Sequence, residues 1–170
     1  MESAIVFVRR SGPSKYLLAL VAALVIFINE GVQAQERSIP KSEAPGPVLV
    51  LSNSNSDTSA GVGFASFSVV SSDFPTGTLA DPKQLVEVQW NTTYYPESIM
   101  EAVKLCYSRP FSSQEDCRKI LPNSSGTLSD FNVQSFGNGS RVRIYHDVYG
   151  GTPRYTRPAG ADSVVFKYRY

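Results

Sequence analysis

The sequence has few of the residues that catalytic and metal sites use. It contains one histidine and two cysteines among 170 residues. It has no P-loop, no G-x-S-x-G serine motif and no H-E-x-x-H zinc motif. The two cysteines and His146, which follows some 30 positions later, are too few for a closed zinc site. We therefore predict a protein that is not an enzyme and uses no metal or cofactor, with His146 as a packed or surface side chain.

Long hydrophobic runs are also scarce, and the clearest one lies near the N-terminus. Residues 16–28 form an apolar run that follows Arg9, Arg10 and Lys15. A transmembrane helix needs about 20 apolar residues, whereas a basic leader with a shorter apolar core is typical of a signal peptide. We predict a signal peptide over residues 1–34, with an uncleaved anchor as the alternative. The protein then belongs to the secretory pathway and is plasma membrane-associated or extracellular.

No charge of one sign dominates the chain. It has 16 basic and 15 acidic residues, and the predicted leader holds three of the basic and two of the acidic ones. The remaining chain is therefore neutral overall, and nothing in the balance indicates a nucleic-acid partner. Basic residues do exceed acidic ones from Arg118 onward. This asymmetry is typical either of two faces with different partners or of chance placement on the surface.

Apolar residues alternate with polar ones in several segments, which indicates half-buried β-strands. The turns between these segments are rich in glycine, proline and asparagine, as in antiparallel sheets. We predict a mainly β protein, a small immunoglobulin-like antiparallel β-sandwich over residues 63–170. The inward faces are expected to hold Val86, Val88 and Trp90; Val103, Leu105 and Tyr107; Val142, Ile144, His146 and Val148; and Val164, Phe166, Tyr168 and Tyr170.

The segment before this domain resembles a linker. Residues 36–47 contain Pro40, Pro45 and Pro47 among serine, glycine and mixed charges, a composition typical of disordered segments. A short strand is expected at VLVL, from Val48, and SNSNSDTSAGVG after it favours a polar loop. We predict a flexible lead-in over residues 35–62.

The only cysteines, Cys106 and Cys117, lie eleven positions apart around a Pro-Phe-Ser-Ser stretch. A structural disulfide, a redox or metal pair, and two unrelated thiols are the alternatives. A redox pair favours C-x-x-C spacing, which is absent. An even cysteine count in an oxidising compartment favours a disulfide. The pattern therefore favours a structural disulfide between the two.

Three sequons provide candidate glycosylation sites. They begin at Asn91, Asn123 and Asn138, and a secretory leader gives such motifs access to the glycosylation machinery. Glycans are bulky and must face solvent. We predict a glycoprotein with these asparagines at turns that enter or leave strands.

The stretch from Gln84 to Pro110 resembles a known family. LVEVQWN followed by VKLCYSRP resembles the plant nitrate-transport accessory proteins, in which a strand ending in Trp precedes a K-V-K-L-C-Y strand, a Pro-containing stretch and a further Cys. The tail from Leu121 onward does not resemble the family, which implies a divergent or shortened relative. The matching positions are Val86, Val88, Trp90, Val103, Lys104, Leu105, Cys106, Tyr107 and Pro110; Val88, Trp90, Val103 and Leu105 are the expected family-motif core.

This resemblance implies a non-catalytic partner of a membrane transporter. Members of the family bind a high-affinity nitrate transporter, support its stability and delivery to the plasma membrane, and are needed for nitrate uptake. A cross-linked loop with mixed charge is pre-organised for docking. The candidate contact residues in and beside that loop are Tyr107, Arg109, Asp116, Arg118 and Lys119.

The alternative function is a secreted glycoprotein module that binds a cell-wall polymer or another extracellular protein. Aromatic side chains supply the stacking surfaces that sugars need, although alternating aromatics in strands are more often part of a core. The aromatic residues of the tail that carry this alternative are Tyr145, Tyr149, Tyr155, Phe166, Tyr168 and Tyr170.

Overall fold

The computed structural model describes residues 34–50, 60–150 and 154–170. The predicted signal peptide, except for Ala34, and most of the polar loop after Val50 lie outside these residues. Within them, no helix has the length and apolar character needed to cross a membrane. Residues Gln35–Tyr170 form one unit, which is described here by itself.

In the described residues of this unit, the regular structure consists of a short 3-10 helix and ten β-strands. They build a four-stranded sheet in the order β1-β10-β4-β7, a second in the order β3-β8-β5-β6, and a two-stranded sheet of β2 and β9. The elements are β1 (Glu36–Glu43), β2 (Val48–Val50), β3 (Gly61–Ser68), η2 (Ser71–Asp73), β4 (Gln84–Asn91), β5 (Met100–Ser108), β6 (Asp116–Ile120), β7 (Ser125–Leu128), β8 (Arg141–Tyr149), β9 (Arg154–Thr156) and β10 (Asp162–Arg169).

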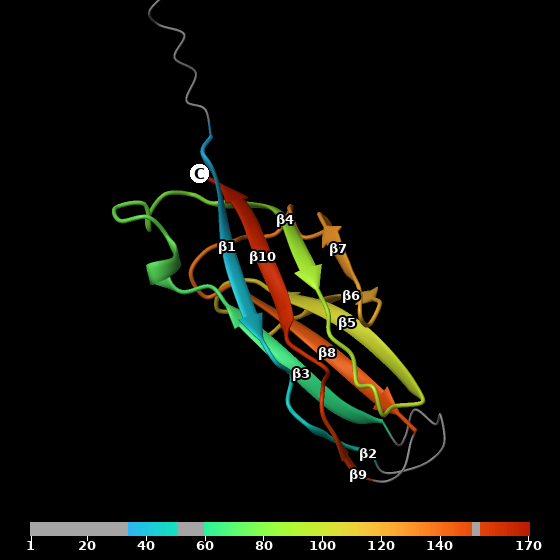
Figure 1. The fold of residues 1–170 in the computed structure, drawn as a ribbon. Coiled ribbons are helices and arrows are strands. Elements are labelled where there is room, and N and C mark those ends of the chain that lie inside the picture. Colours follow the sequence, from blue (N-terminus) through green and yellow to red (C-terminus); the bar gives the residue numbers. More distant parts are fainter. Residues whose placement is uncertain (1–33, 51–59, 151–153) are drawn as a thin grey trace, which may run out of the picture. The chain divides into compact units, whose positions relative to one another are not determined.

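The two four-stranded sheets are antiparallel throughout and pack face to face (Figure 1). Their inner faces share one hydrophobic core, to which β8 contributes Val142 and Ile144 and β10 contributes Phe166 and Tyr168. Phe131, from the segment after β7, also lies in this core. The prediction of an antiparallel β-sandwich is confirmed.

The period-two pattern assigned most inward faces correctly. The inward residues of β8, including His146, are fully buried, and the residues between them are partly exposed. The strand β4 is an exception, because its register against β10 shifts between Lys167 and Tyr168. Lys167 faces Glu87 and Tyr168 faces Leu85, so Val86 is the extra residue of a β-bulge. Leu85 is therefore fully buried, and Val86 lies only partly buried.

The expected flexible lead-in differs from the structure over residues 36–43. These residues form β1, which pairs with the whole of β10, from Glu36 opposite Arg169 to Glu43 opposite Asp162. Its side chains are largely exposed, and Ile39 alone is buried, which explains the linker-like composition. The strand lies at the edge of its sheet, where Pro40 is tolerated because an edge strand leaves N–H groups unpaired. The sandwich therefore begins near residue 36 rather than 63.

The predicted disulfide is confirmed as a bond between neighbouring strands. Cys106 of β5 lies directly opposite Cys117 of β6, and their sulfur atoms are bonded. The alternative interpretation as two unrelated thiols is thus wrong. The bond fixes the edge strand β6 to β5 and closes the loop of residues 109–115, which we name the disulfide loop.

The edge strand β7 packs closely against the single tryptophan because of a glycine. Gly126 lies opposite Trp90 in the β4–β7 register. A Cβ atom on Gly126 would lie 2.6 Å from Trp90 Cζ2, closer than a van der Waals contact. The absence of a side chain at Gly126 therefore lets the indole ring pack against the core.

Replacing Gly126 with alanine is expected to destabilise the fold by about 1–3 kcal/mol, as overpacking does. The matched control is Gly137→Ala, because no atom lies within 4 Å of a Cβ at that position. Chemical denaturation followed by tryptophan fluorescence measures both. Equal stability of the two variants would contradict the close packing at Trp90.

Candidate interaction surface

The structure separates the five predicted contact residues into buried, paired and exposed groups. Tyr107 is fully buried, so its assignment as a contact residue is corrected. Its hydroxyl donates to the Ser135 carbonyl at 2.8 Å and lies 3.2 Å from Ser140 Oγ. Burial raises the pKa of Tyr107 to about 12. Tyr107 is a core residue because it lies on the inward face of β5, with Val103 and Leu105.

Arg118 is engaged within the molecule. Its guanidinium contacts the carboxylates of Asp116 and Asp130, and it lies over the Phe131 ring at 5.4 Å. The hydrogen bonds that Arg118 donates to these two carboxylates raise its pKa above the usual value. Gln134 Nε2 also donates to Asp116 Oδ2 at 2.8 Å. Arg118 and Asp116 thus hold the segment after β7 against β6. This structural role accounts for both side chains without a docked partner.

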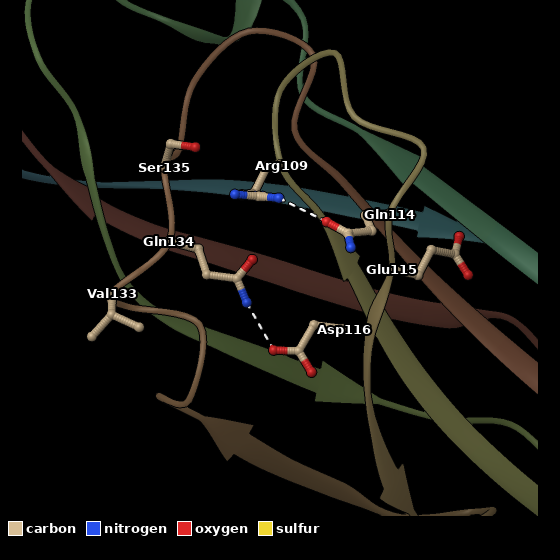
Figure 2. Close-up of a pocket in the computed structure, with 7 residues that line it drawn as sticks. All are labelled: Arg109, Gln114, Glu115, Asp116, Val133, Gln134 and Ser135. Atoms are coloured by element: carbon tan, nitrogen blue, oxygen red, sulfur yellow. Dashed lines mark hydrogen bonds between the residues drawn. The ribbon is translucent and has the colours of Figure 1, made fainter.

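Arg109 and Asp116 line a groove beside the disulfide loop, with a volume of about 430 Å³. Figure 2 shows Arg109 donating to Gln114 on one side and Gln134 donating to Asp116 on the other. We name this the loop groove. Its lining residues are Arg109, Gln114, Glu115, Asp116, Val133, Gln134 and Ser135.

Two apolar side chains are highly exposed on the segments that form the loop groove. Phe111, in the disulfide loop, is 89% exposed, and Val133, on the opposite segment, is 87% exposed. Phe111 also has a positive φ of 55°, which is unusual for a bulky residue and costs backbone energy. No pattern in the sequence marks Val133, because its position depends on the fold of the segment after β7.

Glu115 anchors the disulfide loop to the outer face of the β3-β8-β5-β6 sheet. It accepts a hydrogen bond from Arg143 at 2.8 Å and contacts the Tyr145 hydroxyl at 3.1 Å. Together with the Cys106–Cys117 bond, this contact holds both ends of the loop. The loop groove is therefore pre-organised rather than formed on binding.

Lys119 is exposed on that same outer face. It lies directly opposite Lys104 in the β5–β6 register. Both lysines line a second groove of about 320 Å³ at the end of β6, which we name the lysine groove. Its apolar lining includes Ala102, Ile120 and Leu121. The exposure of Lys119 leaves it available for contact, and its contact role stays a prediction; Lys104 was not among the candidates.

The side chains of the three sequon asparagines, Asn91, Asn123 and Asn138, all lie exposed. Asn91 ends β4, and Asn123 lies in the turn between β6 and β7 with a φ of 46°. Their positions at strand ends agree with the accessibility that glycans need. Glycosylation itself stays a prediction.

The aromatic tail is mostly core rather than a stacking surface. Phe166 and Tyr168 are buried in the sandwich, and Tyr149 is 8% exposed. Tyr155, on β9, is 70% exposed. It lines a groove with Pro96, Glu97 and Arg157. The predicted stacking surface for a polymer is therefore reduced chiefly to Tyr155.

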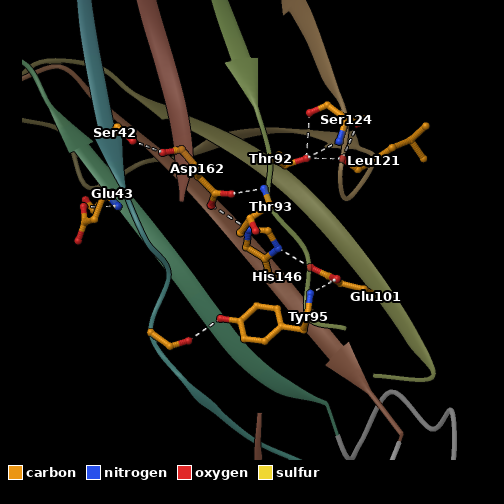
Figure 3. Close-up of polar contacts among 12 residues, drawn as sticks. Ser42, Glu43, Thr92, Thr93, Tyr95, Glu101, Leu121, Ser124, His146 and Asp162 are labelled. Carbon is orange, nitrogen blue, oxygen red and sulfur yellow. Dashed lines mark hydrogen bonds and ion pairs between the residues drawn. The ribbon is translucent and has the colours of Figure 1, made fainter. Parts of the chain in front are cut away.

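The sole histidine lies in a buried cluster of charged groups that the sequence did not reveal. His146 Nδ1 contacts Glu101 Oε1, and His146 Nε2 lies 2.8 Å from Asp162 Oδ2 (Figure 3). The imidazole and the Asp162 carboxylate are fully buried, and Glu101 is 5% exposed. His146 comes from β8, Glu101 from β5 and Asp162 from β10, so the cluster joins the two sheets.

The carboxylates of this cluster also hold the chain between β4 and β5. Asp162 Oδ1 accepts the Thr93 N–H at 2.8 Å, and Glu101 Oε2 accepts the Tyr95 N–H at 3.0 Å. The Tyr95 ring lies edge-on to the imidazole. Its hydroxyl donates a hydrogen bond to the backbone carbonyl of Gly46, which precedes β2. Burial, and to a smaller extent the neighbouring negative charges of Glu101 and Asp162, raise the pKa of Tyr95.

His146 is positively charged at neutral pH in this environment. Burial by itself lowers the pKa of the imidazole, but hydrogen bonds and charges from Asp162 and Glu101 outweigh it and raise the pKa to about 9. A protonated imidazole donates from both ring nitrogens, which satisfies both carboxylates. The sequence-based interpretation of His146 as a packed side chain thus agrees with its position in the core.

Comparisons with known proteins concern the fold. No family model matches the sequence, and no curated protein matches it. The crystal structure of FLHE is similar, with a TM-score of 0.51 and 18% identity, over 81% of this chain and 100% of that chain. At this identity the likeness shows the fold alone.

Two viral structures give lower scores. The mud crab tombus-like virus has a TM-score of 0.36 and 13% identity, over 88% of this chain and 96% of that chain. The Desmodium yellow mottle tymovirus has a TM-score of 0.34 and 13% identity, over 82% and 88%. Neither likeness is strong enough to support an argument.

The buried cluster predicts a loss of stability at alkaline pH. Because the folded pKa of His146 lies above its unfolded value of about 6.5, the cluster stabilises the fold fully below that pH. We expect this contribution, roughly 2–4 kcal/mol, to be lost as pH rises toward 9. Denaturant unfolding between pH 6 and 9.5 measures it.

The control is His146→Gln, which cannot carry the charge. It should be less stable at neutral pH, because Glu101 and Asp162 are left buried without their cation. It should also lose the pH dependence in this window. The same slope in both proteins would contradict the role of His146.

Proposed function

We propose that the protein is a non-catalytic accessory protein that binds and activates a high-affinity nitrate transporter. It acts by surface contact, in the secretory pathway and at the plasma membrane. The observation that carries the contact function is the pre-organised loop groove with Phe111 and Val133 exposed beside it. Exposed aromatic and arginine side chains in rigid surroundings are typical anchors of protein interfaces.

The placement of the histidine favours contact over catalysis. His146 is fully buried, and both ring nitrogens are engaged by carboxylates. It cannot touch a substrate without unfolding of the sandwich. Histidine is the most common general base of enzymes, and the one histidine of this chain has a structural role in the core.

The identity of the partner is supported by the resemblance over Gln84–Pro110. The matching residues Val88, Val103 and Leu105 lie in the core, and Trp90 packs against it. They support a shared sandwich with a strand pair of the same kind. The choice of a nitrate transporter rests on this resemblance, so uptake must be measured directly.

A second candidate function is a secreted glycoprotein module that binds a cell-wall polymer. The observation in its favour is the groove of about 440 Å³ where Tyr155, 70% exposed, lies with Pro96 and Arg157. An exposed tyrosine beside polar groups supplies both stacking and hydrogen bonds for a sugar ring.

The accessory role predicts nitrate uptake in oocytes only when the transporter and this chain are expressed together. The partner is the high-affinity transporter of the same organism. Arg109→Glu with Phe111→Ala should reduce both uptake and co-purification at least about tenfold, as loss of a hot spot does. Both side chains are exposed, so secretion should be unchanged.

The matched control is Tyr155→Ala, which removes an exposed aromatic side chain on β9. It should leave uptake unchanged and instead weaken retention on insoluble wall polysaccharide if the second candidate holds. Arg118 is unsuitable as a test, because it binds Asp116 and Asp130 within the molecule. No uptake with a folded, secreted chain would reject the transporter role.

A further inference from the structure

We propose that the lysine groove binds an acidic, apolar segment of a partner protein. The groove lies at the end of β6, on the outer face of the β3-β8-β5-β6 sheet, and is distinct from the loop groove. Glu101 and Asp147 also line this groove, but Glu101 is paired with His146 and Asp147 with Lys104, so the charge left unpaired is that of Lys119. This second contact surface is inferred from that charge and from the apolar lining beside it, so it does not depend on which partner is bound at the disulfide loop.

Two like charges face each other in this groove. Lys104 and Lys119 are a directly opposed pair in the β5–β6 register, and like charges at such positions destabilise a sheet. Lys104 is partly compensated by Asp147, whose carboxylate lies 3.4 Å from its Nζ. Among the described residues, no acidic side chain pairs with Lys119. One anionic group placed between the two lysines would relieve the repulsion.

The apolar part of the groove lies beside this charge pair. The strand β6 pairs only with residues from Val103 onward, so the start of β5 extends beyond it. Leu121, directly after β6, is 70% exposed. Ala102, Ile120 and Pro122 complete the apolar lining. An apolar side chain can therefore pack here while a neighbouring carboxylate contacts the lysines.

The cross-strand row that begins with Lys119 and Lys104 continues to aromatic residues, whereas Arg143, a further cation on this face, is paired with Glu115. Lys104 lies opposite Tyr145, with its Nζ 5.3 Å from the ring centre, and Tyr145 lies opposite Phe64. Phe64 is 52% exposed. A row of two cations followed by two aromatics fits a mixed acidic and apolar peptide. A polyanion would need cations along the whole row. Because half of this row is aromatic, the peptide is the favoured occupant.

The probe is an acetylated hexapeptide of alternating leucine and glutamate, titrated into the isotope-labelled full-length secreted protein. Amide shifts should concentrate at residues 101–105 and 118–121. A second peptide with glutamine in place of glutamate should bind at least about tenfold more weakly, because the lysine contacts lose their charge. Equal binding of the two peptides would overturn the proposal.

The protein variant is Lys104→Gln with Lys119→Gln, which should weaken binding of the acidic peptide at least about tenfold. Lys167→Gln is the matched control. Its side chain is 41% exposed and paired with Glu87 on the other sheet, much as Lys104 is 42% exposed and paired with Asp147. The double variant removes the repulsion between the lysines together with the part-exposed Lys104–Asp147 pair, so its stability should stay close to that of the wild type, which a melting curve checks.

Two results would assign the groove differently. Binding to phosphatidylserine vesicles that depends on both lysines, without peptide binding, would make it a lipid contact and overturn the proposal. Peptide shifts confined to the loop groove would also overturn it. Loss of nitrate uptake in the oocyte assay does not bear on either result, because the titration uses this chain alone.

Discussion

The buried imidazole of His146, held between the carboxylates of Glu101 and Asp162, is the interaction on which the sandwich depends. It links β8 and β5 of one sheet to β10 of the other. The same two carboxylates receive the backbone N–H groups of Thr93 and Tyr95, so they also fix the chain that crosses between the sheets. A buried charge without its partners is far more costly than a lost apolar contact. The cluster therefore favours one arrangement of these strands over other pairings with similar apolar faces.

This cluster shows where sequence reasoning ends. The alternation in β8 placed His146 on the inward face, and the structure agrees. Its partners lie 45 and 16 residues away along the chain, and they come from different strands. In the sequence, Glu101 and Asp162 are ordinary acidic residues at strand ends. Their burial becomes evident only when the order of strands in both sheets is known. The alternation of apolar and polar residues predicts on which face of a strand a residue lies. It does not predict which residues of other strands lie opposite.

The same limit explains which elements were predicted. Strands with one apolar face were found from their alternation, and the disulfide from compartment and spacing. The strand β1 was missed because it lies at a sheet edge, where Pro40 and polar side chains are tolerated and Ile39 alone reaches the core. The bulge at Val86 was missed because a shift of register leaves no mark in composition. The contact role of Tyr107 was wrong because its aromatic ring fits the inward face of β5.

The division between inward and outward residues also governs what a resemblance can establish. The positions on which the proposed resemblance to the nitrate-transport accessory proteins rests are mainly those that pack the core or form the disulfide, such as Val88, Leu105 and Cys106. Packing constraints of this kind recur wherever the same sandwich is built, which is consistent with the likeness to FLHE at 18% identity. Partner choice must instead depend on side chains that the core does not need. The side chains that we propose for this role are the exposed residues of the disulfide loop, above all Phe111, and Lys119 on the outer sheet face.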